Sequence, residues 1–220
     1  ETFRFAIMKG VAAIILCHNH PSGDPDPSDD DIKITKKLVE SGKILGIDRT
    51  LKLIDNLKSK VVDLGLQDRI ILVCDNFKNL KTIIENCKFS QIHGILFDLG
   101  MSSWHIDESK KGFSFLREEP LDMRYDLQES LTAEMIINQW QEEEIEKVLR
   151  EYGEERFSRR IAREIVRARR IKQISSTFQL VEVIKKATPG FYHRRRIHPA
   201  TKTFQALRIV VNRELENITE

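Results

Sequence analysis

Short apolar runs alternate with helix-length repeats along the first hundred residues. Residues 11–17 form a continuous apolar run of strand length, followed by the turn-rich segment 21–27. Further strands are expected at residues 44–48, 69–74 and 93–99, with helices at 51–64 and 80–86. Strands that alternate with helices in this way predict an α/β fold with a parallel sheet and right-handed crossovers.

The pattern changes after residue 100. Residues 101–128 have no clear period and contain Gly112 and Pro120, so we expect an ordered loop there. Residues 130–186 follow a helical period with no strand candidate, and residues 201–215 form a last helix with an apolar stripe. The sequence therefore predicts a helical insertion behind the sheet.

Composition and charge narrow the choice of partners. The chain has 220 residues, 40% of them hydrophobic and 32% charged, and no apolar run is long enough to predict a membrane span. The net charge is only +2, but residues 147–213 contain 18 Lys or Arg against five Asp or Glu. This basic part is where a polyanion is expected to bind. Three widely spaced cysteines, Cys17, Cys74 and Cys87, predict buried reduced thiols and a cytoplasmic protein.

A first candidate site lies where the first strand ends. His18 and His20 are two positions apart and project to the same side, and Asp31 falls in the first turn of a helix that Ser28 is expected to cap. Two imidazoles and one carboxylate can hold a catalytic zinc ion, with water in the fourth position. A tight turn that the histidines merely cap is the other interpretation.

The pattern His-x-His-Pro followed by Ser-x-x-Asp resembles the JAB/MPN metalloproteases, and residues 3–47 resemble the C-terminal domain of the RadC family. The resemblance implies zinc at His18, His20 and Asp31. It also implies an alternative function, a zinc-dependent metallohydrolase related to RadC. The glutamate that serves as general base in that family has no counterpart in this chain, so a metal site without hydrolysis is also consistent with the pattern.

Five longer motifs occupy the rest of the chain. They are GILFDLG at residues 94–100, GFSF at 112–115, PLDMR at 120–124, YGEERF at 152–157 and HPATKTFQALR at 198–208. With these motifs the chain from residue 46 onward resembles the RsmH family, also called MraW. That resemblance implies S-adenosylmethionine-dependent methylation of the N4 atom of a cytosine in 16S ribosomal RNA.

The resemblance also implies site residues. Asp48 at the tip of a strand would accept the ribose hydroxyls of the cofactor, and Phe77 would lie against its adenine. Asp98 ends the next strand and would both contact the cofactor and act as the catalytic acceptor of the amine proton. His105 would contact the cofactor too, although the family usually has Gln there. Glu119 likewise stands where the family usually has Gly.

Basic residues of the insertion are expected to follow the RNA backbone, around a base that is flipped into a pocket. The ribosomal RNA or the small ribosomal subunit is thus the expected partner. Solvated helix faces with ion pairs to Glu155 or Glu164 are the alternative interpretation of the same residues. The set comprises Arg159, Arg160, Arg163, Arg167, Arg169, Arg170, Arg194, Arg195 and Arg196.

Both resemblances are partial. We expect a RadC-like fragment at residues 1–47, a partial Rossmann-like core at 48–100 and 198–220, and an RNA-facing insertion at 101–197. The glycine-rich loop of the methyltransferases should precede Asp48 by about 20 residues, where the RadC-like helix stands instead. The chain opens with Glu1, and the later strands of the methyltransferase family are not found after residue 215. We therefore expect a truncated protein, joined near residues 45–48, that binds cofactor weakly or not at all. An RNA-binding module without activity is a third hypothesis.

Overall fold

The computed structural model describes residues 42–89, 91–97, 105–106, 108–194 and 196–219, and the backbone alone of residues 13–17. The predicted helix after Ser28 lies outside these residues. The chain divides into two compact units. Residues 1–103 and 216–220 form the first, here called the sheet unit, and residues 104–215 form the second, called the helical unit.

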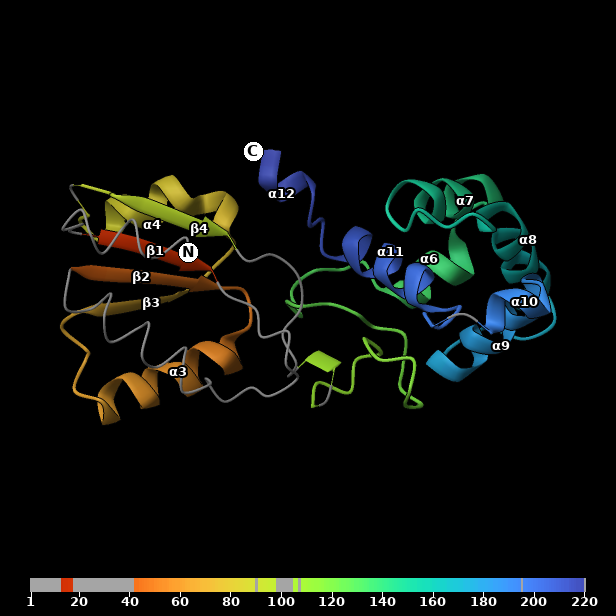
Figure 1. The fold of residues 1–220 in the computed structure, drawn as a ribbon, viewed down its shortest axis with the longest axis horizontal. Helices are drawn as coiled ribbons and strands as arrows, with labels where there is room; N and C mark the ends of the chain where they lie inside the picture. Colours follow the sequence, from red (N-terminus) through yellow and green to blue (C-terminus); the bar gives the residue numbers. More distant parts are fainter. Residues whose placement is uncertain are drawn as a thin grey trace. The chain divides into compact units, whose positions relative to one another are not determined.

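A four-stranded sheet organises the sheet unit (Figure 1). Its strands are β1 (Ala13–Cys17), β2 (Lys43–Asp48), β3 (Ile70–Cys74) and β4 (Gly94–Phe97). They run parallel in the order β3-β2-β1-β4, with Ile15 of β1 beside Leu45 on one side and Ile95 on the other. The predicted α/β fold with a parallel sheet is therefore confirmed, and all four expected strands form.

Helices connect these strands as the apolar pattern predicts. Helix α3 (Leu51–Asp63) follows β2, and the short 3-10 helix η1 (Phe77–Asn79) and helix α4 (Leu80–Asn86) follow β3. Leu45 and Ile47 of β2 form a buried cluster with Ile83 of α4. Helix α3 buries Ile54 to 1% exposure. It connects β2 to the adjacent β3, whereas α4 connects β3 to β4 at the opposite edge of the sheet. Because the two connections run in opposite directions across the sheet, right-handed crossovers place the two helices on opposite faces.

The strand order fixes where a ligand can bind. The chain moves from β2 outward to β3 and then returns past β2 and β1 to β4. Ligands of open parallel sheets bind outside the carboxyl ends of the strands, where the order reverses. In this sheet the carboxyl ends are Cys17, Asp48, Cys74 and Phe97, and they define the sheet edge discussed below.

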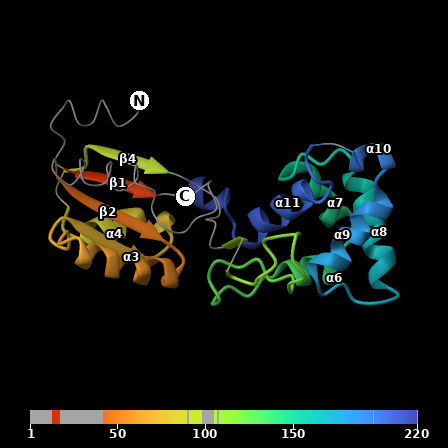
Figure 2. The ribbon, with the colours of Figure 1, turned by 60° about the horizontal axis from the view of Figure 1, so that its bottom comes forward.

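The helical unit is a bundle of short helices, shown from two directions in Figures 1 and 2. Its members are α6 (Ala133–Gln139), α7 (Glu142–Glu151), α8 (Ser158–Arg169), α9 (Thr177–Ala187), α10 (Gly190–His193) and α11 (Thr201–Val211). Helix α7 packs between α8 and α11, and α8 also packs on α9. In the described part of the chain, none of the helices is both long and apolar enough to cross a lipid bilayer.

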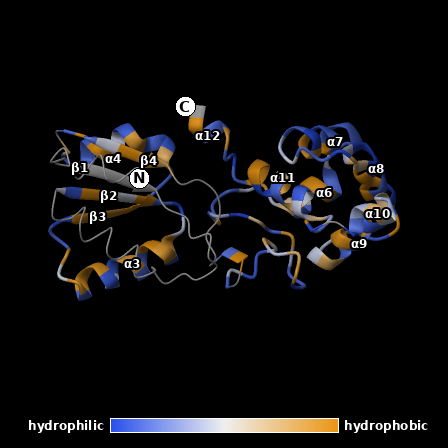
Figure 3. Cartoon of the chain, in the orientation of Figure 1, coloured by the Kyte–Doolittle hydropathy of each residue, from blue (hydrophilic) through white to orange (hydrophobic). Residues whose placement is uncertain are grey.

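Amphipathic sequences explain this packing. Helices α7 and α8 combine hydrophobic and hydrophilic residues in their turns (Figure 3), and they bury Ile145, Leu149, Ile161 and Ile165 completely. Helix α9 begins at Ser176, whose hydroxyl accepts the Gln179 N–H. The apolar period thus predicts both the helices and their buried faces.

Helix α11 lies in the helical unit, packed on α6 and α7. The assignment of residues 198–220 to the methyltransferase core stays a prediction. Cys74 is exposed, whereas the sequence predicted a buried thiol, because it is the last residue of β3. Cys87 is half-buried.

Candidate functional site

Asp48 is the last residue of β2 and stands at the sheet edge. Its Oδ1 accepts the backbone N–H of Thr50 at 2.6 Å, and its carbonyl oxygen accepts the N–H of Asp75 at 3.1 Å. Burial raises the pKa of the Asp48 carboxyl, and the Thr50 hydrogen bond and the nearby Arg49 charge only partly oppose this shift. Burial therefore disfavours the ionised form of Asp48. A carboxylate in such surroundings, at the tip of a parallel strand, is typical of a ligand-binding position.

Phe77 reaches the same edge from the loop after β3. The Asp75 carboxylate accepts the N–H of Asn76 at 2.6 Å and the side-chain amide of Asn79 at 2.8 Å, which fixes the turn that starts η1. The Phe77 ring meets the ring of Phe97, the last residue of β4, edge to face with centroids 5.7 Å apart. The structure thus brings Asp48 and Phe77 to one edge.

The remaining candidates from the sheet unit lie outside the described residues. Asp98 follows Phe97 directly, so β4 leads to it, but its position is not described. The proposed zinc ligands His18, His20 and Asp31 are likewise outside. Within the part of the chain that the structure describes, no group of three or more His, Cys, Asp or Glu residues is arranged to hold a metal ion.

His105 belongs to the helical unit and is 3% exposed. Its ring packs edge to face against Phe113 at 5.1 Å and against Tyr125 at 4.7 Å, and these two rings stack on each other at 5.5 Å. The aromatic cluster leaves His105 almost no surface for a ligand. Its expected contact with the cofactor stays a prediction that this burial does not favour.

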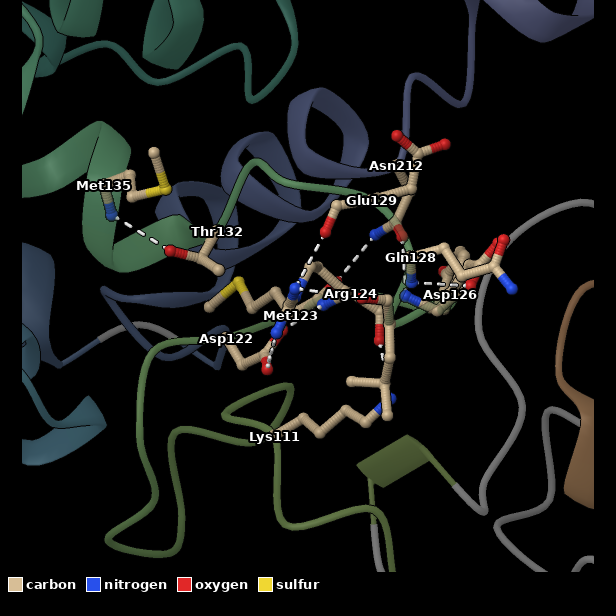
Figure 4. A network of polar contacts seen from close by, with 12 residues as sticks. Lys111, Asp122, Met123, Arg124, Asp126, Gln128, Glu129, Thr132, Met135 and Asn212 are labelled. Carbon is tan, nitrogen blue, oxygen red and sulfur yellow. Dashed lines mark hydrogen bonds and ion pairs between the residues drawn. The ribbon is translucent and has the colours of Figure 1, made fainter.

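A polar network organises the loop that carries the PLDMR motif (Figure 4). The Arg124 guanidinium donates to both carboxylate oxygens of Asp122, at 2.7 and 2.9 Å, and to the carbonyl of Glu129 at 2.7 Å. Lys111 Nζ donates to the Arg124 carbonyl at 3.0 Å. Burial alone would raise the pKa of Asp122, but the Arg124 hydrogen bonds and the charges of Arg124 and Lys111 outweigh it and hold the pKa below its usual range.

Met123, in the middle of this motif, has a left-handed backbone with φ of +60° and a completely buried side chain. Its N–H donates to the Lys111 carbonyl at 2.7 Å, and its own carbonyl accepts the Asn212 amide at 2.8 Å. A long side chain in this backbone region is strained and persists only where its surroundings fix it. The motif is therefore held rigidly between residue 111 and the end of α11.

The loop also depends on Gly112 and Glu119. Gly112 has φ of +80°, and a Cβ there would lie 2.3 Å from the carbonyl oxygen of Pro120. The buried Glu119 carboxylate accepts the Gly112 N–H at 2.9 Å, while the Glu119 N–H donates to the hydroxyl of Thr177 on α9. The Glu119 side chain therefore closes the loop on itself, and the Glu119 backbone links the loop to α9.

The arginines predicted to contact RNA have different surroundings. Arg169 donates to the carbonyls of Ile137 and Trp140, both at 2.7 Å, so it joins α8 to the end of α6. Arg163 pairs with Glu142 at 3.6 Å, and Arg167 lies 3.9 Å from Glu164. Other predicted arginines are exposed and have no carboxylate within 4.0 Å among the described residues. They are Arg159, Arg160, Arg170, Arg194 and Arg196. Arg195 is outside the described residues.

Comparison with known sequences places this geometry in a family. Residues 32–220 match the MraW methylase family, which is most of the chain. The chain belongs to the MraW methylase family. Membership agrees with the parallel sheet, with the carboxylate at the tip of β2, and with the five motifs.

Individual members of the family are similar over the same region. The small subunit ribosomal RNA methyltransferase H of Brevibacillus brevis is 46% identical over 187 residues, which cover 85% of this chain and 59% of the relative. The protein of the same name from Clostridium botulinum strain Kyoto is 44% identical over 184 residues, 84% of this chain and 58% of the relative. The chain thus spans about three-fifths of the length of these MraW relatives.

The N-terminal part matches a second family. Residues 1–56 match the RadC-like JAB domain, which overlaps the MraW match at residues 32–56. Strand β1 falls in the part that only the RadC-like match covers, yet it pairs with β2 on one side and β4 on the other. A strand from outside the MraW match therefore occupies the inside of the parallel sheet.

Sequence reasoning did not assign roles to several residues that shape the MraW loop. Lys111 and Arg124 lie within the loop at residues 111–129 and hydrogen-bond to each other. Thr177 and Asn212 contact the loop from distant points of the chain. The PLDMR motif was a usable signal for Asp122 and Arg124. For Thr177 and Asn212 the sequence offered none, because their partners lie 58 and 89 positions away.

Proposed function

We propose that the chain binds S-adenosylmethionine at the sheet edge and serves the N4-methylation of a cytosine in 16S ribosomal RNA. The single observation that supports this most is the position of Asp48 and Phe77 at the carboxyl edge of a parallel sheet, through the contacts of Asp48 with Asp75 and of Phe77 with Phe97, in a chain of the MraW methylase family. Relatives named small subunit ribosomal RNA methyltransferase H support the choice of substrate.

The residues at the edge fit the adenosyl end of this cofactor. The Asp48 carboxylate offers acceptors for the two ribose hydroxyls, and the partly exposed Phe77 ring offers an aromatic surface for adenine. When bound, S-adenosylmethionine supplies an electrophilic methyl group. The glycine-rich loop that would hold its methionine end has no counterpart in the sequence before Asp48.

The cytosine amine needs a proton acceptor close by. Its nitrogen lone pair is delocalised into the ring, so an acceptor that removes the proton must be positioned as the methyl group is transferred. Asp98, the residue that follows Phe97 in the sequence, is the candidate that the sequence provides. The exposed arginines of α8 and of the segment after α10 would bind the RNA backbone through charge.

The zinc-dependent metallohydrolase is not favoured. It depends on His18, His20 and Asp31, which the structure does not describe, and the described residues offer no metal-binding group. The RadC-like match covers 56 residues, and the MraW match covers 189.

A methyl-transfer assay tests the proposal. The chain is incubated with S-adenosylmethionine carrying a labelled methyl group and with small ribosomal subunits that lack the modification, and the nucleosides are then separated by mass spectrometry. We expect label in N4-methylcytidine only, and less than a tenth of it with Asp48→Ala. Asp55→Ala, an exposed carboxylate on α3, is the matched control and should leave the yield unchanged.

Two outcomes would count against the proposal. Label in a different nucleoside would refute the N4-cytosine assignment, and equal yields from Asp48→Ala and the parent chain would refute the sheet edge as the cofactor site. Because cofactor affinity is expected to be weak, the assay is run at single turnover with cofactor concentrations raised to saturation. Photo-crosslinking of the cofactor to the chain then reports binding independently of turnover.

A further inference from the structure

Aromatic rings and arginines meet where α10 packs against the start of α8. Phe157, at the N-terminus of α8, contacts Phe191 at 6.3 Å and Tyr192 at 4.9 Å between ring centroids. The Arg156 guanidinium lies over both phenylalanines, 4.8 Å from the ring of Phe157 and 5.8 Å from that of Phe191. Arginine and two aromatic rings thus form one contiguous surface.

Buried contacts hold this surface in place from beneath. Glu155 is 1% exposed, and its carboxylate accepts the Tyr192 hydroxyl at 2.8 Å and the Phe157 N–H at 2.9 Å. The Thr188 hydroxyl and the His193 ring form a second hydrogen bond of 2.8 Å across α10. The position of Phe191 is therefore set by its neighbours on both sides rather than by its own burial.

Phe191 itself is 57% exposed, which is unusual for a large aromatic side chain in a well-packed unit. Tyr192, the next residue, is buried, so the chain turns one ring inward and leaves the other in solvent. An exposed ring beside a guanidinium offers two flat surfaces on which a third planar group can stack.

Exposed positive charge lies on the two chain segments that carry the rings. Arg159 and Arg160 lie in the first turn of α8, and Arg194 and Arg196 follow α10. All four are exposed, and the described residues place no carboxylate within 4.0 Å of any of them or of Arg156. The exposed carboxylate nearest in sequence, Glu154, carries one negative charge against these five positive ones.

We propose that Phe191 and Arg156 form a stacking platform for an unpaired base of single-stranded RNA, with the four flanking arginines on its phosphates. The inference rests on the proposed function and names the form of RNA that the helical unit recognises. Duplex RNA keeps its bases stacked inside the helix, so it would use the charges but not the ring. An aromatic side chain stacks on bases with little regard to sequence, whereas phosphate contacts supply salt-dependent affinity.

Binding of a fluorescent 12-nucleotide RNA, measured by anisotropy, tests the platform. We expect Phe191→Ala to weaken binding of the single strand by about fivefold to a hundredfold, and Phe191→Trp to restore it. Arg156→Lys keeps the charge but loses the planar group, so it should weaken the single strand more than the duplex. Phe178→Ala, which removes a 43% exposed phenylalanine on α9, is the matched control and should leave affinity unchanged.

Several results would overturn the platform. Equal affinity of Phe191→Ala and the parent chain for the single strand would do so. A loss of affinity for duplex RNA as large as the loss for the single strand would do so too. Binding to vesicles of phosphatidylserine and phosphatidylcholine that depends on Phe191, with RNA binding unaffected, would point to a membrane surface instead. Melting temperatures of all variants show whether each is folded.

Methyl transfer measured on the same samples separates this inference from the proposed function. Stacking-dependent RNA binding without N4-methylcytidine would refute the proposed function and leave the platform. N4-methylcytidine formed equally well by Phe191→Ala and the parent chain, with unchanged RNA affinity, would refute the platform alone.

Discussion

Arg124 holds Asp122 through two parallel hydrogen bonds, from Nε to Oδ1 at 2.7 Å and from Nη2 to Oδ2 at 2.9 Å (Figure 4). Both residues are about four-fifths buried, so water competes little with the pair. The same guanidinium reaches the Glu129 carbonyl, so this one ion pair closes the loop that carries the PLDMR motif. Its strength should therefore be measurable as stability of the helical unit.

Asp122→Asn should lower the free energy of unfolding of this unit by about 1.5–3 kcal/mol at pH 7, because the hydrogen bonds lose their charge. The pKa of Asp122 is held below its usual range, so its stabilisation is full above a pH of about 3.9 and is lost as the pH falls through the lower folded value. Urea unfolding followed by circular dichroism at several pH values measures this.

The exposed carboxylate of Glu143 on α7 supplies the control for Asp122. Glu143→Gln should change stability by no more than a few tenths of a kcal/mol. If the difference between the parent chain and Asp122→Asn were the same at pH 7 and well below pH 3, the stabilisation would not come from the ionised carboxylate.

Gly112→Ala should destabilise the helical unit by more than about 1 kcal/mol. The new Cβ would lie 2.3 Å from the Pro120 carbonyl oxygen, and alanine disfavours the φ of +80°. Gly190→Ala is the matched control, since a Cβ at Gly190 meets nothing within 4 Å and the position starts a helix. Equal melting temperatures for the two variants would show that the loop adapts.

Asp48→Asn should raise the melting temperature of the sheet unit by about 2–4 °C at pH 7 while it weakens cofactor binding. Burial raises the pKa of Asp48, so ionisation destabilises the fold as the pH rises through that value, and asparagine removes this cost. The gain should vanish below a pH of about 3.9, where aspartate is protonated in both states. Differential scanning calorimetry of both proteins from below a pH of about 3.9 to pH 7 measures the difference in melting temperature. A lower melting temperature of Asp48→Asn at pH 7 would contradict the unfavourable burial of the Asp48 carboxylate.

Much of the sheet unit could be predicted from sequence because its signals are local. The apolar run before Cys17, the strand ending at Asp48 and the helical period through Ile54 each fix one element within a few residues. The order of the strands was not accessible in this way. The parallel pairing of Ile15 with Leu45 and with Ile95 joins segments 30 and 80 positions apart.

The candidate site could be predicted only in part. Asp48 and Phe77 were accessible because each directly follows a strand, and parallel strands bring their carboxyl ends to one edge. The surroundings of Arg169 were not accessible, because nothing in the run of arginines distinguishes it from Arg170. Only the packing of α8 against the end of α6 turns one guanidinium inward.

The position of β1 inside the sheet leads to a backbone test. Every N–H of an interior strand donates to a neighbour, so Ile15→Pro removes a hydrogen bond between β1 and its partners and leaves a buried carbonyl without a donor. The orphaned carbonyl alone costs about 1–3 kcal/mol. Hydrogen exchange should show reduced protection of β2 and β4, whereas Ile15→Val should not. Unchanged protection would mean that the RadC-like segment is no part of the sheet.

Arg169 and Arg170 provide the sharpest comparison on α8, since they are adjacent and chemically identical. Arg169→Ala should lower the stability of the helical unit by about 2–4 kcal/mol, because two part-buried carbonyls lose a charged donor. Arg170→Ala should leave stability within about 0.5 kcal/mol and weaken RNA binding, most strongly at low salt. Urea unfolding and RNA anisotropy on both variants separate the two roles. If Arg169→Ala weakened RNA binding without any loss of stability, its guanidinium would be an RNA contact and not a link between α8 and α6.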